Sequence, residues 1–200
     1  MTSVVRWVEV HRLAVAGRDA GIARDAGNRV GQVWLARSRF ADVARLAELT
    51  LALGEDARAS YQLGWARRAT GNPAAALAAY GQALRLYRAA GDRGDEAATL
   101  NNIGAAYLGQ GEPQRALEYY GQALPILREV GDRAGEAVTR YNVAMICRAQ
   151  RELGRAVAEL EQVVELDRQV SHPDLQSDTE MLQRVRQELA SSNPGPAGSE

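Results

Sequence analysis

The side chains that could act as nucleophiles, general bases or metal ligands are few and far apart in this chain. One cysteine, Cys147, and two histidines, His11 and His172, occur in 200 residues. Nucleophilic catalysis would need a base beside Cys147, and a metal site would need several ligands together. Cys147 falls on an apolar position of a helical pattern, which favours a buried structural thiol, and we expect both histidines at the surface. The sequence therefore predicts no catalytic and no metal-binding residues.

Motifs for phosphate, nucleotide or hydrolase chemistry are also missing. The sequence has no GxSxG, HExxH, GxxxxGK or GxGxxG motif, and all 24 basic residues are Arg. The absence of Lys excludes a phosphate-loop lysine and a Schiff-base lysine. Acidic residues such as Asp95 and Glu96 fall at expected helix starts, where capping or solvation explains them. We predict that the protein is not an enzyme and takes no cofactor.

Charge and hydropathy exclude two further classes of partner. The formal net charge is −1, and the arginines alternate with acidic residues, which does not favour binding to nucleic acid. The first twenty residues lack the apolar run of a signal peptide, and no stretch has the roughly 18 apolar residues of a membrane-spanning helix. With a free thiol in addition, the sequence predicts a cytoplasmic protein without membrane contact.

Repetition is the strongest signal in the sequence. Three 40-residue blocks, which begin at Ala57, Ala97 and Ala137, align without gaps. Large and small apolar side chains match in register at Leu63, Ile103 and Val143; at Gly64, Gly104 and Ala144; and at Tyr80, Tyr120 and Leu160. Each block spaces its apolar residues as an amphipathic helix does, so we predict an all-α protein.

Each block carries a break in its middle, which predicts two antiparallel helices per block. The break reads GNP at 71–73 and GEP at 111–113. Gly suits the residue after a helix, and Pro suits the first turn of the next one. RELG at 151–154 lacks the proline, so we expect a less regular turn there. One such hairpin cannot bury its apolar stripe alone, so the hairpins are expected to stack.

These blocks resemble the tetratricopeptide repeat. The signature of that family, a large residue, Leu-Gly and Tyr followed by Ala, an aromatic residue and Ala, is matched by Leu100, Ile103, Gly104, Tyr107, Ala116, Tyr120 and Ala123. The 40-residue period and the LNNIG segment are similar to the long-helix variant found in bacterial signalling ATPases and in eukaryotic scaffold and motor-adaptor proteins. The resemblance implies a right-handed α-solenoid of antiparallel helical hairpins, the superhelix of this family.

We expect one solenoid domain over residues 1–190. It would consist of an N-terminal helix at 3–23, a divergent repeat at 24–56, repeats at 57–96, 97–136 and 137–172, and a capping helix at 174–190. The register of the first 56 residues stays open, because AGNR at 26–29 also resembles the linker AGDR at 90–93. The Pro- and Gly-rich segment 191–200 is predicted to be disordered.

The resemblance also implies where a partner would bind. In this family the first helix of each pair lines the concave side, and Asn residues at the LNN positions contact an extended peptide. The concave residues carried over to this chain are Tyr61, Gln62, Trp65, Arg68, Asn101, Asn102, Ala105, Leu108, Tyr141, Asn142, Met145 and Arg148. The aromatic residues and Met would act as apolar anchors, and the two arginines would meet acidic groups. Structural roles compete with these, because Trp65 could pack between helices and the Asn residues could bridge repeats.

The predicted function is a non-catalytic scaffold that binds a peptide or protein segment on its concave side. The alternative is an oligomerising or regulatory segment of a larger signalling ATPase or transcriptional regulator, in which the repeats would sense or repress. Homo-oligomerisation is compatible with both hypotheses, and the sequence does not decide between them.

Overall fold

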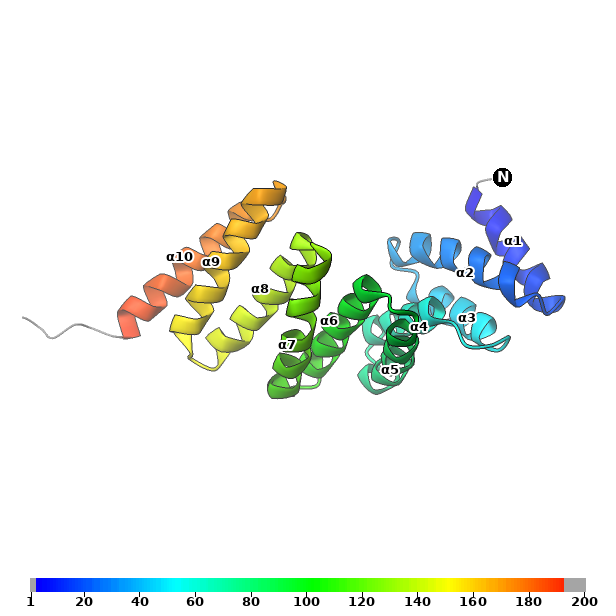
Figure 1. The fold of residues 1–200 in the computed structure, drawn as a ribbon, viewed down its shortest axis with the longest axis horizontal. Helices are drawn as coiled ribbons and strands as arrows, with labels where there is room; N and C mark the ends of the chain where they lie inside the picture. The colour runs from blue at the N-terminus through cyan, green and yellow to red at the C-terminus, as the bar shows by residue number, and fades with distance from the viewer. Residues whose placement is uncertain (1–2, 193–200) are drawn as a thin grey trace, which may run out of the picture. The chain divides into compact units, whose positions relative to one another are not determined.

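The computed structural model describes residues 3–192, and within that range it contains ten α-helices and no strand (Figure 1). The helices are α1 (Ser3–Ala16), α2 (Ala20–Leu35), α3 (Phe40–Leu51), α4 (Ala57–Ala69), α5 (Pro73–Ala90), α6 (Arg93–Gly109), α7 (Pro113–Val130), α8 (Arg133–Ala149), α9 (Leu153–Val170) and α10 (Leu175–Ser192). The all-α prediction is confirmed.

The chain divides into two compact units, Met1–Glu112 and Pro113–Glu200. The first unit holds α1 to α6 and the second holds α7 to α10. Consecutive helices pack on each other within each unit. The predicted repeat at 97–136 therefore contributes its first helix to one unit and its second helix to the other. The single domain over 1–190 stays a prediction.

The turns between helices share one backbone conformation at intervals of 20 residues. A left-handed residue follows the helix at Gly71 (φ 77°), Gly91 (68°), Gly111 (77°), Gly131 (72°), Arg151 (64°) and Ser171 (51°). The RELG turn thus keeps the backbone of the glycine turns, against our expectation. It differs in its cap, because Glu152 makes no side-chain bond to the helix start, whereas Asn72 accepts a bond from the Ala75 amide at 3.2 Å.

The N-terminal segment folds differently from the predicted helix at 3–23 and repeat at 24–56. Helix α1 ends at Ala16, and Asp19 then caps α2 by accepting a hydrogen bond from the Ile22 amide at 3.0 Å. Such a cap satisfies an amide that the first turn of a helix leaves unpaired. The AGNR segment lies inside α2 and is not a linker. Helix α2 packs on both α1 and α3.

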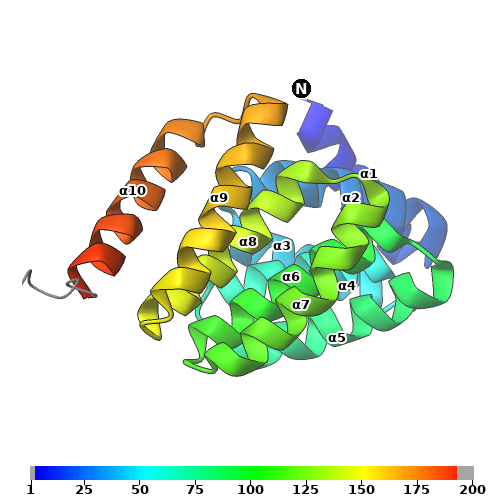
Figure 2. The same ribbon diagram turned by 60° about the vertical axis from the view of Figure 1, so that its left-hand side comes forward.

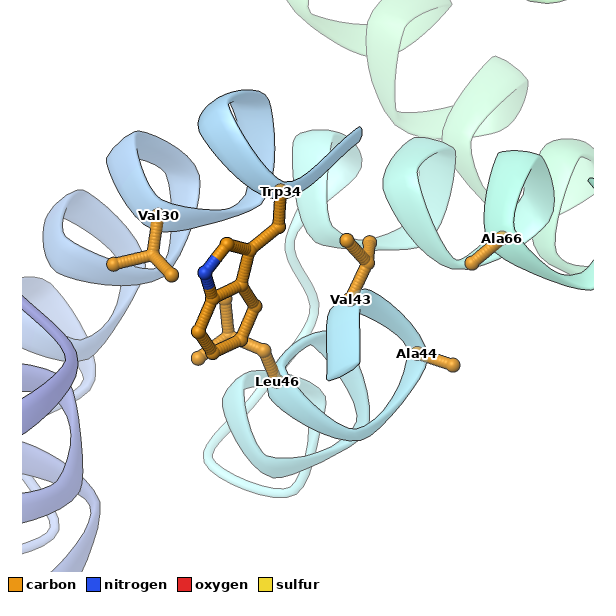
Figure 3. Packing of buried hydrophobic residues seen from close by; sticks show 6 residues of the cluster. All are labelled: Val30, Trp34, Val43, Ala44, Leu46 and Ala66. Carbon is orange, nitrogen blue, oxygen red and sulfur yellow. The ribbon is translucent and has the colours of Figure 1, made fainter. Parts of the chain in front are cut away.

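A cluster of apolar side chains joins α2, α3 and α4. Its members are Val30, Trp34, Val43, Ala44, Leu46 and Ala66. Trp34 lies against Leu46 in Figure 3, which shows the side chains of α2 directed at α3. Partly buried residues of α1, among them Trp7, pack against this cluster and hold the first helix on the unit.

His11 is buried in the same unit, with 2% of its surface exposed, so the predicted surface position is wrong. Its Nε2 lies 2.9 Å from Thr50 Oγ1, and that hydroxyl donates to the Leu46 carbonyl at 3.0 Å. Since the hydroxyl has one proton, Nε2 of His11 must be the donor to Thr50. Burial lowers the pKa of His11 below its ordinary value, which favours the neutral ring.

Two equivalent glutamates tie successive helices together. Glu96 and Glu136 stand 40 residues apart and are buried, so solvation does not explain the first of them. Arg88 donates to Glu96 at 2.9 Å, and the equivalent Arg128 donates to Glu136 at 2.8 Å. Arg140 adds a second bond to Glu136 at 2.9 Å. Burial opposes ionisation of Glu136, but the bonds from the two arginines outweigh it and lower the pKa of this carboxyl.

Helix α10 extends beyond the predicted capping helix. It runs from Leu175 to Ser192, so residues 191 and 192, which we expected in a disordered tail, are helical. Residues 193–200 of that predicted tail lie outside the described residues. Leu182 and Val185 are buried, because α10 packs on α9 with its apolar side.

Candidate functional site

The twelve predicted site residues occupy four equivalent positions in three first helices. Four lie on α4 and four on α6, in the first unit, and four lie on α8, in the second unit. Each unit therefore carries its own candidate surface.

One strip of the first unit brings most of its predicted residues together. We call it the α4–α6 face; it comprises Tyr61, Trp65, Arg68, Asn101, Asn102, Ala105 and Leu108. Residues three, four and seven positions apart share one side of a helix, which aligns the members on each helix. The Asn102 side chain then joins the two helices, because its Nδ2 donates to the Tyr61 hydroxyl at 2.9 Å.

The α4–α6 face exposes large apolar side chains beside polar ones. Trp65 is 36% exposed and Leu108 is 37% exposed. The Trp65 ring meets the Tyr61 ring edge-on, with 6.2 Å between centroids, and Tyr61 in turn lies 5.8 Å from the buried Tyr80 ring. These contacts fix the orientation of the indole, so Trp65 packs on Tyr61 and stays partly exposed. Burial and the nearby Asp95 raise the pKa of Tyr61, so it stays a neutral hydroxyl.

Asn102 forms a bridge between two repeats. Its Nδ2 also donates to the Ala98 carbonyl at 3.0 Å, so both amide protons are used within the protein. The side-chain oxygen is what Asn102 can still offer to a peptide, as an acceptor for an N–H group.

Gln62 does not belong to the exposed face. It is 3% exposed and points at α2, where its Nε2 lies 3.4 Å from the Asn28 carbonyl. Gly31 leaves the space for it: a Cβ at this glycine would come within 2.3 Å of the Gln62 side-chain oxygen. The predicted binding role of Gln62 is therefore wrong, and this side chain joins α4 to α2 instead.

On α8 the predicted residues are partly covered by α10. Arg148 donates two hydrogen bonds to the carboxylate of Glu188. Its Nε lies 3.1 Å from one oxygen, and its Nη2 lies 2.5 Å from the other. The predicted role of Arg148 toward an acidic partner is thus taken by a residue of the same chain. Met145 lies beside this ion pair, in a shallow depression that Arg148 and Glu188 also line.

Tyr141 and Asn142 line a cavity of about 330 Å³ in the second unit. Figures 1 and 2 show α8, α9 and α10 side by side around this part of the unit. The other lining residues are Ala137, Val138, Asp167, His172, Asp174, Ser177 and Asp178. The sequence prediction missed the residues from α9 onward. The sequence does single out Asp167, because this charged residue stands at an apolar position of the helical pattern, after Leu160, Val163 and Val164.

Three further findings concern Cys147, clusters of metal-ligating side chains and the apolar character of the helices. Cys147 is fully buried, and burial raises the pKa of its thiol, as expected for a structural cysteine. No three His, Cys, Asp or Glu side chains within residues 3–192 are arranged to hold a metal ion. None of the described helices has the length and apolar character needed to span a bilayer.

Solved structures show what this fold is similar to. BtubC (BKLC) from P. vanneervenii matches with a TM-score of 0.65 at 14% identity, over 100% of this chain and 97% of that chain. MamA matches with a TM-score of 0.66 at 16% identity, over 84% of this chain and 88% of that one. The apo form of RapI gives 0.68 at 16% identity, over 96% of this chain and 66% of that one. At these identities the likeness shows the fold alone, an α-solenoid. No curated protein matches the chain.

Two family models match the region of the repeats. Both are described as tetratricopeptide repeat; one covers residues 57–89 and the other covers 91–169, together more than half of the chain. This repeat is a non-catalytic scaffold for protein–protein interaction. From the matched repeats and the α-solenoid fold, we conclude that the chain belongs to the tetratricopeptide repeat family.

Proposed function

We propose that the α4–α6 face binds an extended peptide segment of a partner protein. The observation that carries this proposal is the exposure of Trp65 and Leu108 on a face that the Tyr61–Asn102 hydrogen bond holds in place. Exposed aromatic side chains that are held rigidly lose little entropy on binding, and such residues dominate binding energies at interfaces.

The face offers a distinct role to each kind of side chain. Trp65 and Leu108 would cover apolar side chains of the segment, and the Asn102 oxygen would accept a hydrogen bond from a peptide N–H. Arg68 is the cationic side chain of the face and would meet a carboxylate of the segment. This combination of side chains favours binding of a peptide in which an apolar residue lies close to an acidic one.

The proposal can be tested by selecting peptides from a random display library against the full chain. The affinity of a labelled selected peptide is then measured by fluorescence anisotropy for the wild type and for Trp65→Ala. Loss of an aromatic hot spot typically costs 2 kcal/mol or more, so we expect binding to weaken by about thirtyfold.

Leu13→Ala is the matched control, because Leu13 is an exposed apolar residue of the same unit, 55% exposed on α1. It should leave the affinity unchanged. If Trp65→Ala binds like the wild type, the α4–α6 face is not the binding site. If Trp65→Ala instead changes the sedimentation of the free protein, the face mediates self-association, as the regulatory alternative requires. The cytoplasm stays the proposed location, on the ground of the free Cys147 thiol.

A further inference from the structure

A carboxylate without a hydrogen-bond donor lies in the wall of the second unit's cavity. Asp167, on α9, is 1% exposed, and its Oδ2 has no hydrogen-bond partner among the described residues. Its other oxygen lies 3.9 Å from His172 Nδ1, beyond hydrogen-bonding distance. Burying an unpaired carboxylate is unfavourable by several kcal/mol in general. A cation next to Asp167 Oδ2 would offset this cost.

The other groups around the cavity do not supply that cation. Asp174 and Asp178 add two more carboxyl groups, and the nine lining residues, all described, include no arginine. His172 Nδ1 lies 3.9 Å from Asp167 Oδ1 and 3.8 Å from Asp174 Oδ2, and it accepts a hydrogen bond from the Asp174 amide at 3.3 Å, so it donates to neither carboxylate. Burial, a side-chain hydrogen bond with Asp167 and the charges of Asp167 and Asp174 raise the pKa of Asp178 to about 6, so above that pH Asp178 loses the proton that it can share with Asp167. The lining thus brings three carboxyl groups together without an arginine.

The shape and chemistry of the cavity narrow the choice of cation. Its volume of about 330 Å³ lies at the lower end of the range for ligand pockets, roughly 300–1,000 Å³, which suits a side chain better than a cofactor. The acidic groups are not arranged as metal ligands. Tyr141 provides an aromatic ring, and Asn142 and Ser177 provide oxygen acceptors. Several carboxylates beside an aromatic ring match the planar, five-donor guanidinium group better than a compact ammonium.

We propose that this cavity binds the guanidinium group of an arginine side chain carried by a partner peptide, with Asp167 as the central carboxylate. That the arginine belongs to a partner peptide rests on the proposed function, whereas the binding of a guanidinium group in the cavity does not. Asp178 and Asp174 complete the negative wall, and Tyr141 covers the guanidinium plane. The arginine donates to Asp167 Oδ2 and so satisfies the oxygen that the folded chain leaves without a donor.

The test uses the isotopically labelled full chain and the capped amino acid N-acetyl-arginine methylamide, followed by NMR at neutral pH. Saturable shifts of the Tyr141, Asn142 and Ser177 amides are expected. Capped citrulline, which keeps the shape of arginine but has no charge, should cause no such shifts. Capped lysine should bind at least severalfold more weakly. Equal shifts with citrulline, or shifts confined to other parts of the chain, would overturn the proposal.

Two variants assign the effect to the cavity. Asp167→Asn should weaken binding of capped arginine about tenfold or more, since it removes a charged hydrogen bond to the guanidinium group. Its thermal stability should equal or exceed that of the wild type, because an unpaired buried charge is removed. Asp178→Asn should also weaken binding and serves if the first variant fails to fold. Glu165→Gln is the matched control on α9: Glu165 is exposed, paired with Arg168 and outside the cavity. It should bind like the wild type.

The outcomes separate this proposal from the proposed function. If Asp167→Asn binds capped arginine as the wild type does, the cavity proposal fails, while the Trp65→Ala result on the first unit is unaffected. If Asp167→Asn abolishes a self-association that sedimentation detects in the wild type, the arginine comes from a second copy of this chain, and the peptide source is overturned.

Discussion

Substituting Gly64 by Ala is a direct test of how closely the paired helices α4 and α5 approach each other. Gly64 lies in the middle of α4 and faces the ring of Tyr80 on α5, which is fully buried. A Cβ added at Gly64 would lie 2.6 Å from Tyr80 Cδ1 and 2.7 Å from Cε1, whereas ordinary contacts begin near 3.4 Å. The ring cannot move away freely, because Tyr61 packs on it at 5.8 Å between centroids.

The expected loss of stability follows from two opposed effects. Replacing Gly by Ala within a helix gains about 1 kcal/mol in helix propensity. Overpacking of a filled core typically costs about 1–3 kcal/mol, and the rigid ring places Gly64→Ala at the upper end. The free energy of unfolding should therefore fall by about 2 kcal/mol. The measurement is guanidinium denaturation followed by far-UV circular dichroism.

Gly81→Ala is the matched control, since Gly81 lies in the middle of α5 and a Cβ there would meet nothing within 4 Å. This variant should be more stable than the wild type by about 0.5–1 kcal/mol, the propensity gain alone. If Gly64→Ala proves as stable as Gly81→Ala, the helices do not approach as described, and the packing argument for the small residue fails.

Three further results are expected. Cys147 should resist a maleimide at neutral pH in the native protein and react fully in denaturant, because burial raises the pKa of its thiol; fast labelling of the native chain would contradict its burial. Glu136→Gln should lower the free energy of unfolding by about 2 kcal/mol in denaturant titrations, since it removes the negative charge that accepts hydrogen bonds from both Arg128 and Arg140. Because the pKa of Glu136 is lowered in the fold, its contribution is present above the ordinary value of 4.5 and disappears as the pH falls below it; the variant should lack that acid loss. The lowered pKa of His11 has a similar effect at higher pH: stability should fall as the pH drops below 6.5, and thermal melts of His11→Gln should show a flatter pH profile, whereas an unchanged profile would argue against the burial of a neutral ring.

The repeat region shows what periodicity can predict. The alternation of small and large apolar residues from Ala57 onward is enough to place the helices α4 to α9 and the turns between them. Packing between helices alone decides which residue types occupy those apolar positions. The N-terminal region was harder, since its turns at Arg18 and Ser38 adopt the left-handed conformation without glycine. The usual glycine signal for a helix end is therefore missing there.

The site was predictable only in part, because a polar side chain on a helix can serve the surface or the neighbouring helix. Gln62 points to α2 because Gly31 leaves room, a relation across 31 positions that no local pattern reveals. Arg148 is paired with Glu188 on a helix that the sequence identified only as a cap. Asp167 carried a usable signal, a charged residue in an apolar register, and such an exception to the pattern marks a functional candidate.

The left-handed turns also imply that the chain does not open evenly. A residue other than glycine in this conformation costs roughly 1 kcal/mol of stability. Such residues occur in the first two and the last two turns between helices, at Arg18, Ser38, Arg151 and Ser171. The turns at 71, 91, 111 and 131 avoid this strain through glycine. Amide hydrogen exchange should therefore be fastest in the outer hairpins and slowest in the glycine-linked centre, and Arg151→Gly should slow exchange in the hairpin of α8 and α9. In a chain of repeats, such a gradient lets the terminal hairpins fray while the middle stays folded.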